Sequence, residues 1–179
     1  MPFVLRRADP IDPTFVPPPD GQPSVRAPVA NALWRASELG TQVAAVVSSG
    51  WELLDRELPG GGWPCQAVTE VLMPQPCVIE WRLLGPALQS VVAAEGQVAV
   101  VAPPRHPYLP GLLHEGLNER QFVWVQADAP AERLWVAEQL IKANACSALI
   151  AWLPQVRPEQ LRRLQACAQS CEGLVFLCR

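Results

Sequence analysis

The sequence predicts an α/β protein with a doubly wound, mainly parallel sheet that has helices on both faces. Short apolar runs of β-branched and small residues, such as 97–102 (QVAVVA) and 148–152 (ALIAW), are typical of strands that are covered on both faces. Between these runs, apolar residues recur at three- and four-residue spacing, which is the pattern of an amphipathic helix. Strands that alternate with helices in this way form a parallel sheet.

The first part of the chain predicts a leader and then short elements. Residues 1–32 are rich in proline, so we expect a flexible leader, with a polyproline II docking segment around PTFVPPP as the alternative. The folded domain is then expected at 33–179. It opens with a short amphipathic helix over 33–39, whose apolar residues are Leu33, Trp34 and Leu39.

The next segment predicts two strands around a helical turn. A short apolar strand is expected at 44–47 and a buried strand at 68–72. A helical turn between them is marked by apolar residues at three- and four-residue spacing, namely Trp51, Leu54 and Leu58. The run PGGGWP at 59–64 predicts a turn with unusual backbone angles.

The rest of the chain alternates helix and strand. Helices are expected at 79–93, 108–115 and 131–143, and a last one runs from Pro158, at its first position, to about Cys171. The strands expected between and after them are 97–102, 122–125, 148–152 and 174–177. The helix over 79–93 has a wide apolar stripe made of Ile79, Leu83, Leu84, Leu88, Val91 and Val92.

Composition limits the classes of function. Half of the 179 residues are apolar and the net charge is −3, which allows one substantial core and argues against strong, direct nucleic-acid binding. The start of the chain lacks the continuous apolar region of a signal peptide, and no run is long enough to span a bilayer. We therefore expect a cytoplasmic protein without membrane contact.

Residues 48–81 follow the order of elements seen in RecA-type ATPases, with a degenerate phosphate-binding loop. A working loop has the pattern G-x-x-x-x-G-K-[ST], whose backbone N–H groups and lysine hold the phosphates. The matching positions here are Met73, Pro74, Gln75, Pro76, Cys77, Val78, Ile79 and Glu80. Two prolines lack N–H donors, no glycine remains, and Ile79 stands at the lysine position.

The other catalytic groups of such an ATPase are also missing from the sequence. The positions of its catalytic glutamate hold Ala102, Pro103 and Pro104, none of which can accept a proton, and Trp152 stands where the metal-orienting aspartate would be. We therefore expect no enzyme activity and no cofactor. Of the three functions that we consider for this chain, a nucleotide-binding enzyme of the RecA class is the one that the sequence supports least.

Several other residues are candidates for chemistry. The six cysteines form no C-x-x-C pair, so buried free thiols are expected rather than a metal site. His106 and His114 are expected to be ordinary loop histidines, although an acid such as Glu115 or Asp128 would allow a metal or acid–base pair.

Three further residues are candidates near the degenerate loop. Glu70 is expected to end its strand as a hydrogen-bonding or surface residue rather than to act in catalysis. Glu80 is expected to pair with Arg82 or to cap the helix start, where its charge suits the helix dipole. Trp81 and Trp152 are expected in the core, or protruding into the space that a nucleotide would occupy.

The chain resembles the ImuA family of RecA-like proteins. The motifs that carry the resemblance are LWRASELG (33–40), SGWELLDRELPGGGWP (49–64), VTEVLMPQPCVIEWRLLGPAL (68–88), VAVVAPPRHPYLPGL (98–112), WVAEQLIKANACSALIAWLP (135–154) and LRRLQACAQSCEGLVFLCR (161–179). The resemblance implies an accessory protein of SOS-induced mutagenic translesion synthesis. Its implied partners are ImuB, the error-prone replicative-type polymerase and RecA, with Leu33, Trp34 and Leu39 as candidate contacts.

From position 76 onward the chain is also similar to SulA, the SOS inhibitor of cell division that binds FtsZ. This similarity implies an alternative function, a division inhibitor whose sheet and later helices carry the interface. The candidate rim residues of that interface are Arg105, Arg120, Arg162 and Arg163.

Overall fold

The computed structural model describes residues 45–75, 79–106, 108–114 and 116–179. The predicted leader at 1–32 and the predicted helix at 33–39 lie outside the described residues. In chain order the elements are β1 (Val46–Val47), α2 (Glu52–Glu57), β2 (Trp63–Pro64), β3 (Val68–Val71), α3 (Glu80–Ala93), β4 (Val98–Val101), α4 (Leu109–His114), the 3₁₀ helix η1 (Glu119–Gln121), β5 (Phe122–Val125), α5 (Pro130–Lys142), β6 (Ala148–Trp152), α6 (Pro158–Ala168) and β7 (Leu174–Cys178).

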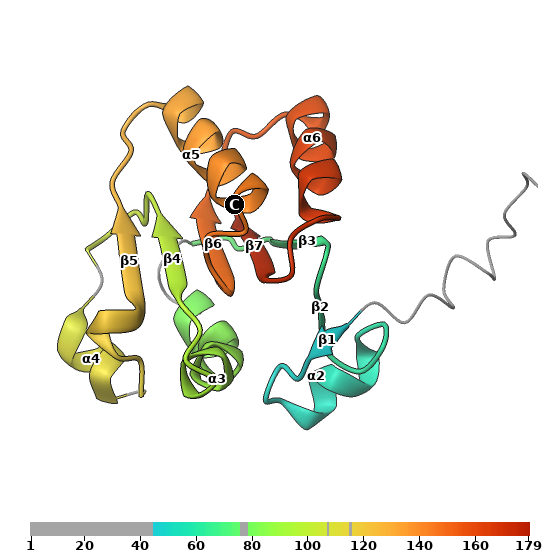
Figure 1. The fold of residues 1–179 in the computed structure, drawn as a ribbon, viewed down its shortest axis with the longest axis vertical. Coiled ribbons are helices and arrows are strands. Elements are labelled where there is room, and N and C mark those ends of the chain that lie inside the picture. The colour runs from blue at the N-terminus through green and yellow to red at the C-terminus, as the bar shows by residue number, and fades with distance from the viewer. Residues whose placement is uncertain (1–44, 76–78, 107, 115) are drawn as a thin grey trace, which may run out of the picture. The chain divides into compact units, whose positions relative to one another are not determined.

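Five strands form the central sheet, in the order β3-β7-β6-β4-β5 (Figure 1). Every neighbouring pair in this sheet is parallel. The three inner strands β4, β6 and β7 are buried along their whole length, which is why they read as continuous apolar runs. The predicted α/β class and parallel sheet are confirmed.

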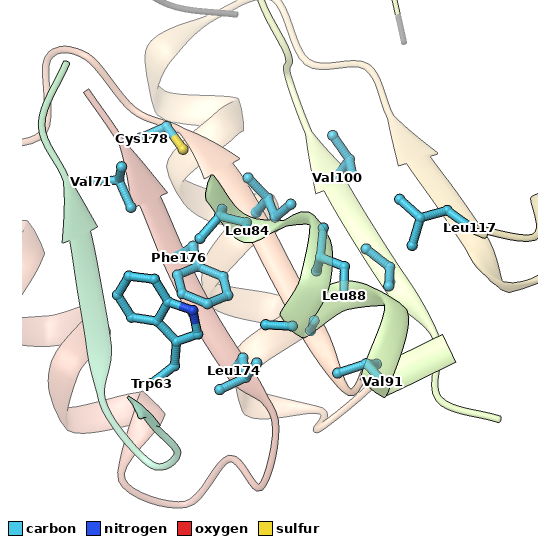
Figure 2. Close-up of a cluster of buried hydrophobic side chains, with 14 of the residues drawn as sticks. Trp63, Val71, Leu84, Leu88, Val91, Val100, Leu117, Leu174, Phe176 and Cys178 are labelled. Carbon is cyan, nitrogen blue, oxygen red and sulfur yellow. The ribbon is translucent and has the colours of Figure 1, made fainter. Parts of the chain in front are cut away.

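Helices cover both faces of the sheet, with α5 and α6 on one side and α3 and α4 on the other (Figure 1). Side chains alternate along each strand, so Val98 and Val100 pack with Leu84 and Leu88 of α3, whereas the intervening β4 residues pack with α5 and α6. Figure 2 shows the first of these clusters, in which Leu84 and Leu88 lie beside Val100 and Phe176. The expected apolar stripe of α3 is therefore largely confirmed.

Strand β2 (Trp63–Pro64) lies within the run 59–64, for which the sequence predicts only a turn. β2 pairs antiparallel with β1, with Val47 opposite Trp63. The pairing is close: a Cβ on Gly62 would lie 2.5 Å from the carbonyl oxygen of Val47. Trp63 is buried and packs edge-on against Phe176 with ring centroids 5.4 Å apart, so a contact distant in sequence helps to hold this short strand.

Two details of the predicted helices are wrong. Ile79 precedes α3 as its N-cap residue and is 52% exposed, so it is not part of the buried stripe. The last helix ends at Ala168 rather than near Cys171. Cys171 is buried nevertheless, because the chain turns and Asn144 Oδ1 accepts hydrogen bonds from Cys171 Sγ and from the Glu172 amide.

None of the helices in the described ranges is long and apolar enough to cross a membrane.

Candidate functional site

The candidate site lies at the carboxyl ends of three neighbouring strands, where the chain passes from β3 into α3. The register places Val71 opposite Cys178 and Cys178 opposite Trp152, so these strand ends are side by side. In open parallel sheets, ligands bind outside the carboxyl ends of the strands. The phosphate-binding loop of an ATPase would occupy this position.

A buried carboxylate occupies the first turn of α3. Glu80 is 1% exposed, and its Oε1 accepts a hydrogen bond of 3.1 Å from the indole Nε1 of Trp152. Its Oε2 accepts a bond of 3.2 Å from the backbone N–H of Ile79. The carboxyl group therefore lies at the start of α3, the position that the capping alternative for Glu80 expected. Arg82, the other expected partner, has an exposed side chain.

An aromatic row lies next to this carboxylate. The ring of Trp81 packs between those of Phe122 and Trp152, with centroid separations of 6.0 and 5.9 Å. Trp152 is 3% exposed, so it belongs to the core and does not protrude into a nucleotide space. Trp81 is half-buried. The core interpretation of Trp152 is thus confirmed.

The structure describes only part of the segment 73–80 that the sequence predicts to be a degenerate phosphate-binding loop. Met73 is half-buried and its N–H donates to the carbonyl of Arg179, whereas Pro74 and Gln75 are exposed. Pro76, Cys77 and Val78 lie outside the described residues.

Glu70, one residue before the end of β3, faces the last residue of the chain. Arg179 Nε lies 2.7 Å from Glu70 Oε2, although its N–H does not point at that oxygen. The carboxylate is therefore held by an ion pair at the edge strand. The expectation that Glu70 ends the strand as a hydrogen-bonding or surface residue is only partly met, because the strand ends at Val71, and Glu70 is half-buried with an Oε2 that accepts no hydrogen bond.

The two candidate histidines are outside β3, α3 and β6, the elements that meet at this site. His106 packs edge-on against Trp124, with ring centroids 4.5 Å apart, in the loop after β4. His114 ends α4. In the described part of the chain, no group of three or more His, Cys, Asp or Glu side chains could hold a metal ion.

The four candidate arginines are exposed but do not form one cluster. Arg105 follows the carboxyl end of β4, Arg120 precedes the amino end of β5, and Arg162 and Arg163 are on α6. Arg163 Nη2 lies 2.6 Å from Glu138 Oε2 of α5, so this side chain also joins two helices.

The described cysteines are free thiols: Cys65, Cys146, Cys167, Cys171 and Cys178. Burial raises the pKa of the Cys146 thiol to about 11 and also raises the pKa of the Cys65 thiol. A thiol with a raised pKa is protonated at neutral pH, and only the thiolate is a good nucleophile or metal ligand. These two cysteines therefore act as small apolar residues of the fold.

Comparison with known proteins gives matches in structure but none in sequence. No protein-family model matches the chain, and no curated protein matches it in sequence. Among solved structures, the chain is similar to the crystal structure of SulA from Pseudomonas aeruginosa, with a TM-score of 0.53 and 19% identity. The match covers 63% of this chain and 96% of that protein. At this identity the match shows a SulA-like fold and nothing further.

Proposed function

We propose that this chain is a non-catalytic accessory protein of SOS-induced mutagenic translesion DNA synthesis, similar to ImuA. It acts through contacts with ImuB and the error-prone polymerase, and RecA is a further candidate partner. The observation that carries the non-catalytic part of the proposal is the position of Glu80. Its buried carboxylate stands at the helix start where a nucleotide-binding protein would place a phosphate.

A helix N-terminus binds phosphate because its free N–H groups and its dipole attract an anion. Here the N–H of Ile79 already donates to Glu80 Oε2, and the buried Glu80 side chain occupies the helix start. A phosphate would have to displace this side chain, and Ile79 offers no cation in place of the missing lysine.

Calorimetric titration with ATP and Mg²⁺ tests this part of the proposal. We expect no binding at micromolar to millimolar nucleotide, in the wild type and in Glu80→Gln alike, because removing one charge restores neither the loop nor the lysine. Binding of ATP at low micromolar concentration would contradict the non-catalytic proposal.

The accessory role itself is tested by association. We expect the purified chain to bind ImuB at micromolar concentration, and we expect Trp34→Ala to weaken that binding. The matched control is Trp135→Ala, which removes a 61% exposed indole from α5. In cells, deletion is expected to reduce damage-induced mutagenesis while division stays normal. Absence of any association with ImuB or RecA would count against the proposal.

The alternative proposal is a SulA-like division inhibitor that binds FtsZ, and the observation that favours it is the SulA-like fold. Under this alternative, expression of the chain produces filamentous cells, and charge reversal at Arg105, Arg120, Arg162 or Arg163 reduces filamentation. Normal cell length at high expression, together with no binding to purified FtsZ, would exclude it.

A further inference from the structure

Strand β5 is an unprotected edge of the sheet. Among the described residues it pairs with β4 alone, and its four residues, FVWV, include no charge, proline or glycine. Val123 is 43% exposed and Trp124 is 40% exposed. Edge strands are normally protected by charges, prolines or bulges, because their free backbone groups can pair with another chain. The opposite edge, β3, has such protection, since Glu70 is on that strand in an ion pair with Arg179.

The ladder with β4 determines which backbone groups of β5 face outward. The Ala102 N–H donates to the carbonyl of Val125 at 2.9 Å. In a parallel ladder, the N–H and C=O of one residue point to the same side, and those of the next residue point to the other side. Val123 and Val125 therefore face β4. The residues whose backbone groups face away from the sheet are Phe122, Trp124 and Gln126. The Phe122 N–H already donates to the Glu119 carbonyl of η1, so only its C=O is left for the edge.

We propose that two copies of this chain pair through β5, antiparallel, about a twofold axis at Trp124, and so join their sheets into one. In this register Trp124 lies opposite Trp124 of the second copy, and Phe122 lies opposite Gln126 of the second copy. The two Trp124 residues then form a hydrogen-bonded pair, and each Gln126 N–H meets the Phe122 carbonyl of the other copy. The Phe122 N–H keeps its bond to Glu119 within its own chain.

Charge complementarity selects this register. The axis at Trp124 brings Arg120, just before β5, toward Asp128 of the second copy, just after β5, at both ends of the paired strands. Both residues are exposed in the single chain. If the twofold axis were at Val123, outward-facing backbone groups of the two copies would again lie opposite each other. Arg120 would then lie opposite Gln126, however, and no charge pair would form.

The side chains suit a pair of this kind. Phe122 and Trp124 are on the face that carries α3, because they are in register with Val98 and Val100. In the paired strands the two Trp124 indoles lie opposite each other on that face. Cross-strand aromatic pairs stabilise antiparallel strands, and pairing also covers the exposed part of Trp124.

Sedimentation velocity on the full chain, with charge reversal, tests the pairing. We expect a dimer that Arg120→Asp or Asp128→Arg weakens about tenfold or more, because like charges replace attractive pairs at both ends. The double variant, R120D with D128R, is expected to restore the dimer. Arg162→Asp is the matched control, because it makes the same charge change on exposed α6 and should leave the dimer intact. A wild-type chain that stays monomeric at about 100 μM, where interfaces of micromolar affinity are filled, would overturn the proposal.

Oxidative crosslinking tests the register. Directly opposed hydrogen-bonded residues have Cα atoms about 5.5 Å apart, which a disulfide can span. We expect Trp124→Cys to form a disulfide between the two copies at position 124. We expect no disulfide between the two copies at position 123 in Val123→Cys. The wild-type protein is the control for crosslinks through the native thiols. A dimeric Trp124→Cys protein without that disulfide, or a self-disulfide at position 123, would overturn this register.

Discussion

At the residue scale, the hydrogen bond between Glu80 and Trp152 is the central contact of the candidate site. A buried carboxylate is stabilised only when its oxygens receive hydrogen bonds, and here an indole N–H and a backbone N–H supply them. The benefit is mutual, because the indole N–H of Trp152 is also buried. Loss of the Glu80 oxygen would therefore remove the acceptor of a buried donor.

This dependence predicts different effects for two substitutions of Glu80. Glu80→Gln keeps an oxygen that accepts from Trp152, whereas Glu80→Leu leaves the buried indole N–H without that acceptor. We expect Glu80→Leu to lower the free energy of unfolding by about 1–3 kcal/mol, and Glu80→Gln to lower it by less. Urea unfolding followed by tryptophan fluorescence measures both. The control is Glu57→Leu at an exposed position of α2. Equal stability of Glu80→Leu and wild type would show that the bond does not stabilise the fold.

The sequence could not predict this contact for a geometric reason. Glu80 and Trp152 are 72 positions apart, and only the assembled sheet brings the end of β6 beside the start of α3. What the sequence did predict was the loss of phosphate-binding residue types around Ile79, since that loss is a matter of local composition. Which side chain occupies the site, here Glu80, depends on tertiary packing, which the local sequence pattern does not show.

At the scale of elements, the sequence predicted most strands and helices to within two residues, because their signals are local. The inner strands are apolar runs, and α5 and α6 begin at Pro130 and Pro158, where a missing N–H is harmless. The strand predicted at 44–47 contains β1, but β2 and its pairing with β1 were missed, because β2 has only two residues and depends on distant contacts. Such strands have no periodicity to detect.

The turn between β1 and α2 gives a prediction at this scale. Gly50 and Gly61 both have a positive φ, of 78° and 82°, but a Cβ on Gly50 would lie 2.2 Å from Pro86 Cβ of α3, whereas Gly61 has open space. We expect Gly61→Ala to lower the free energy of unfolding by about 1 kcal/mol, through backbone strain alone. Gly50→Ala is expected to lower it by more, because α3 must also shift. Equal losses in chemical denaturation would show that this turn does not pack closely on α3.

At the scale of the whole molecule, ion pairs join the two helices that cover one face of the sheet. The Glu138 side chain of α5 is 8% exposed, and its oxygens lie 2.6 Å from Lys142 Nζ on the same helix and 2.6 Å from Arg163 Nη2 on α6. The fold shared with SulA does not determine a function, since one architecture serves many. The ion pairs of this chain do make its stability depend on pH.

The hydrogen bond from Lys142, and the positive charges of Arg163 and Lys142, lower the pKa of Glu138 below its ordinary value of 4.5, although burial opposes the shift. A carboxyl group whose pKa is lower in the folded state adds stability above the unfolded-state pKa, and that stability is lost as pH falls through the folded-state pKa. We therefore expect Glu138→Gln to lower the free energy of unfolding by about 1 kcal/mol at pH 7. The difference in the free energy of unfolding between Glu138→Gln and wild type should shrink once the pH falls below 4.5. Urea unfolding between pH 7 and pH 3 measures this, with Glu159→Gln, exposed at the start of α6, as control. A difference that stays constant over this range would mean that the charge of Glu138 does not stabilise the helix pair.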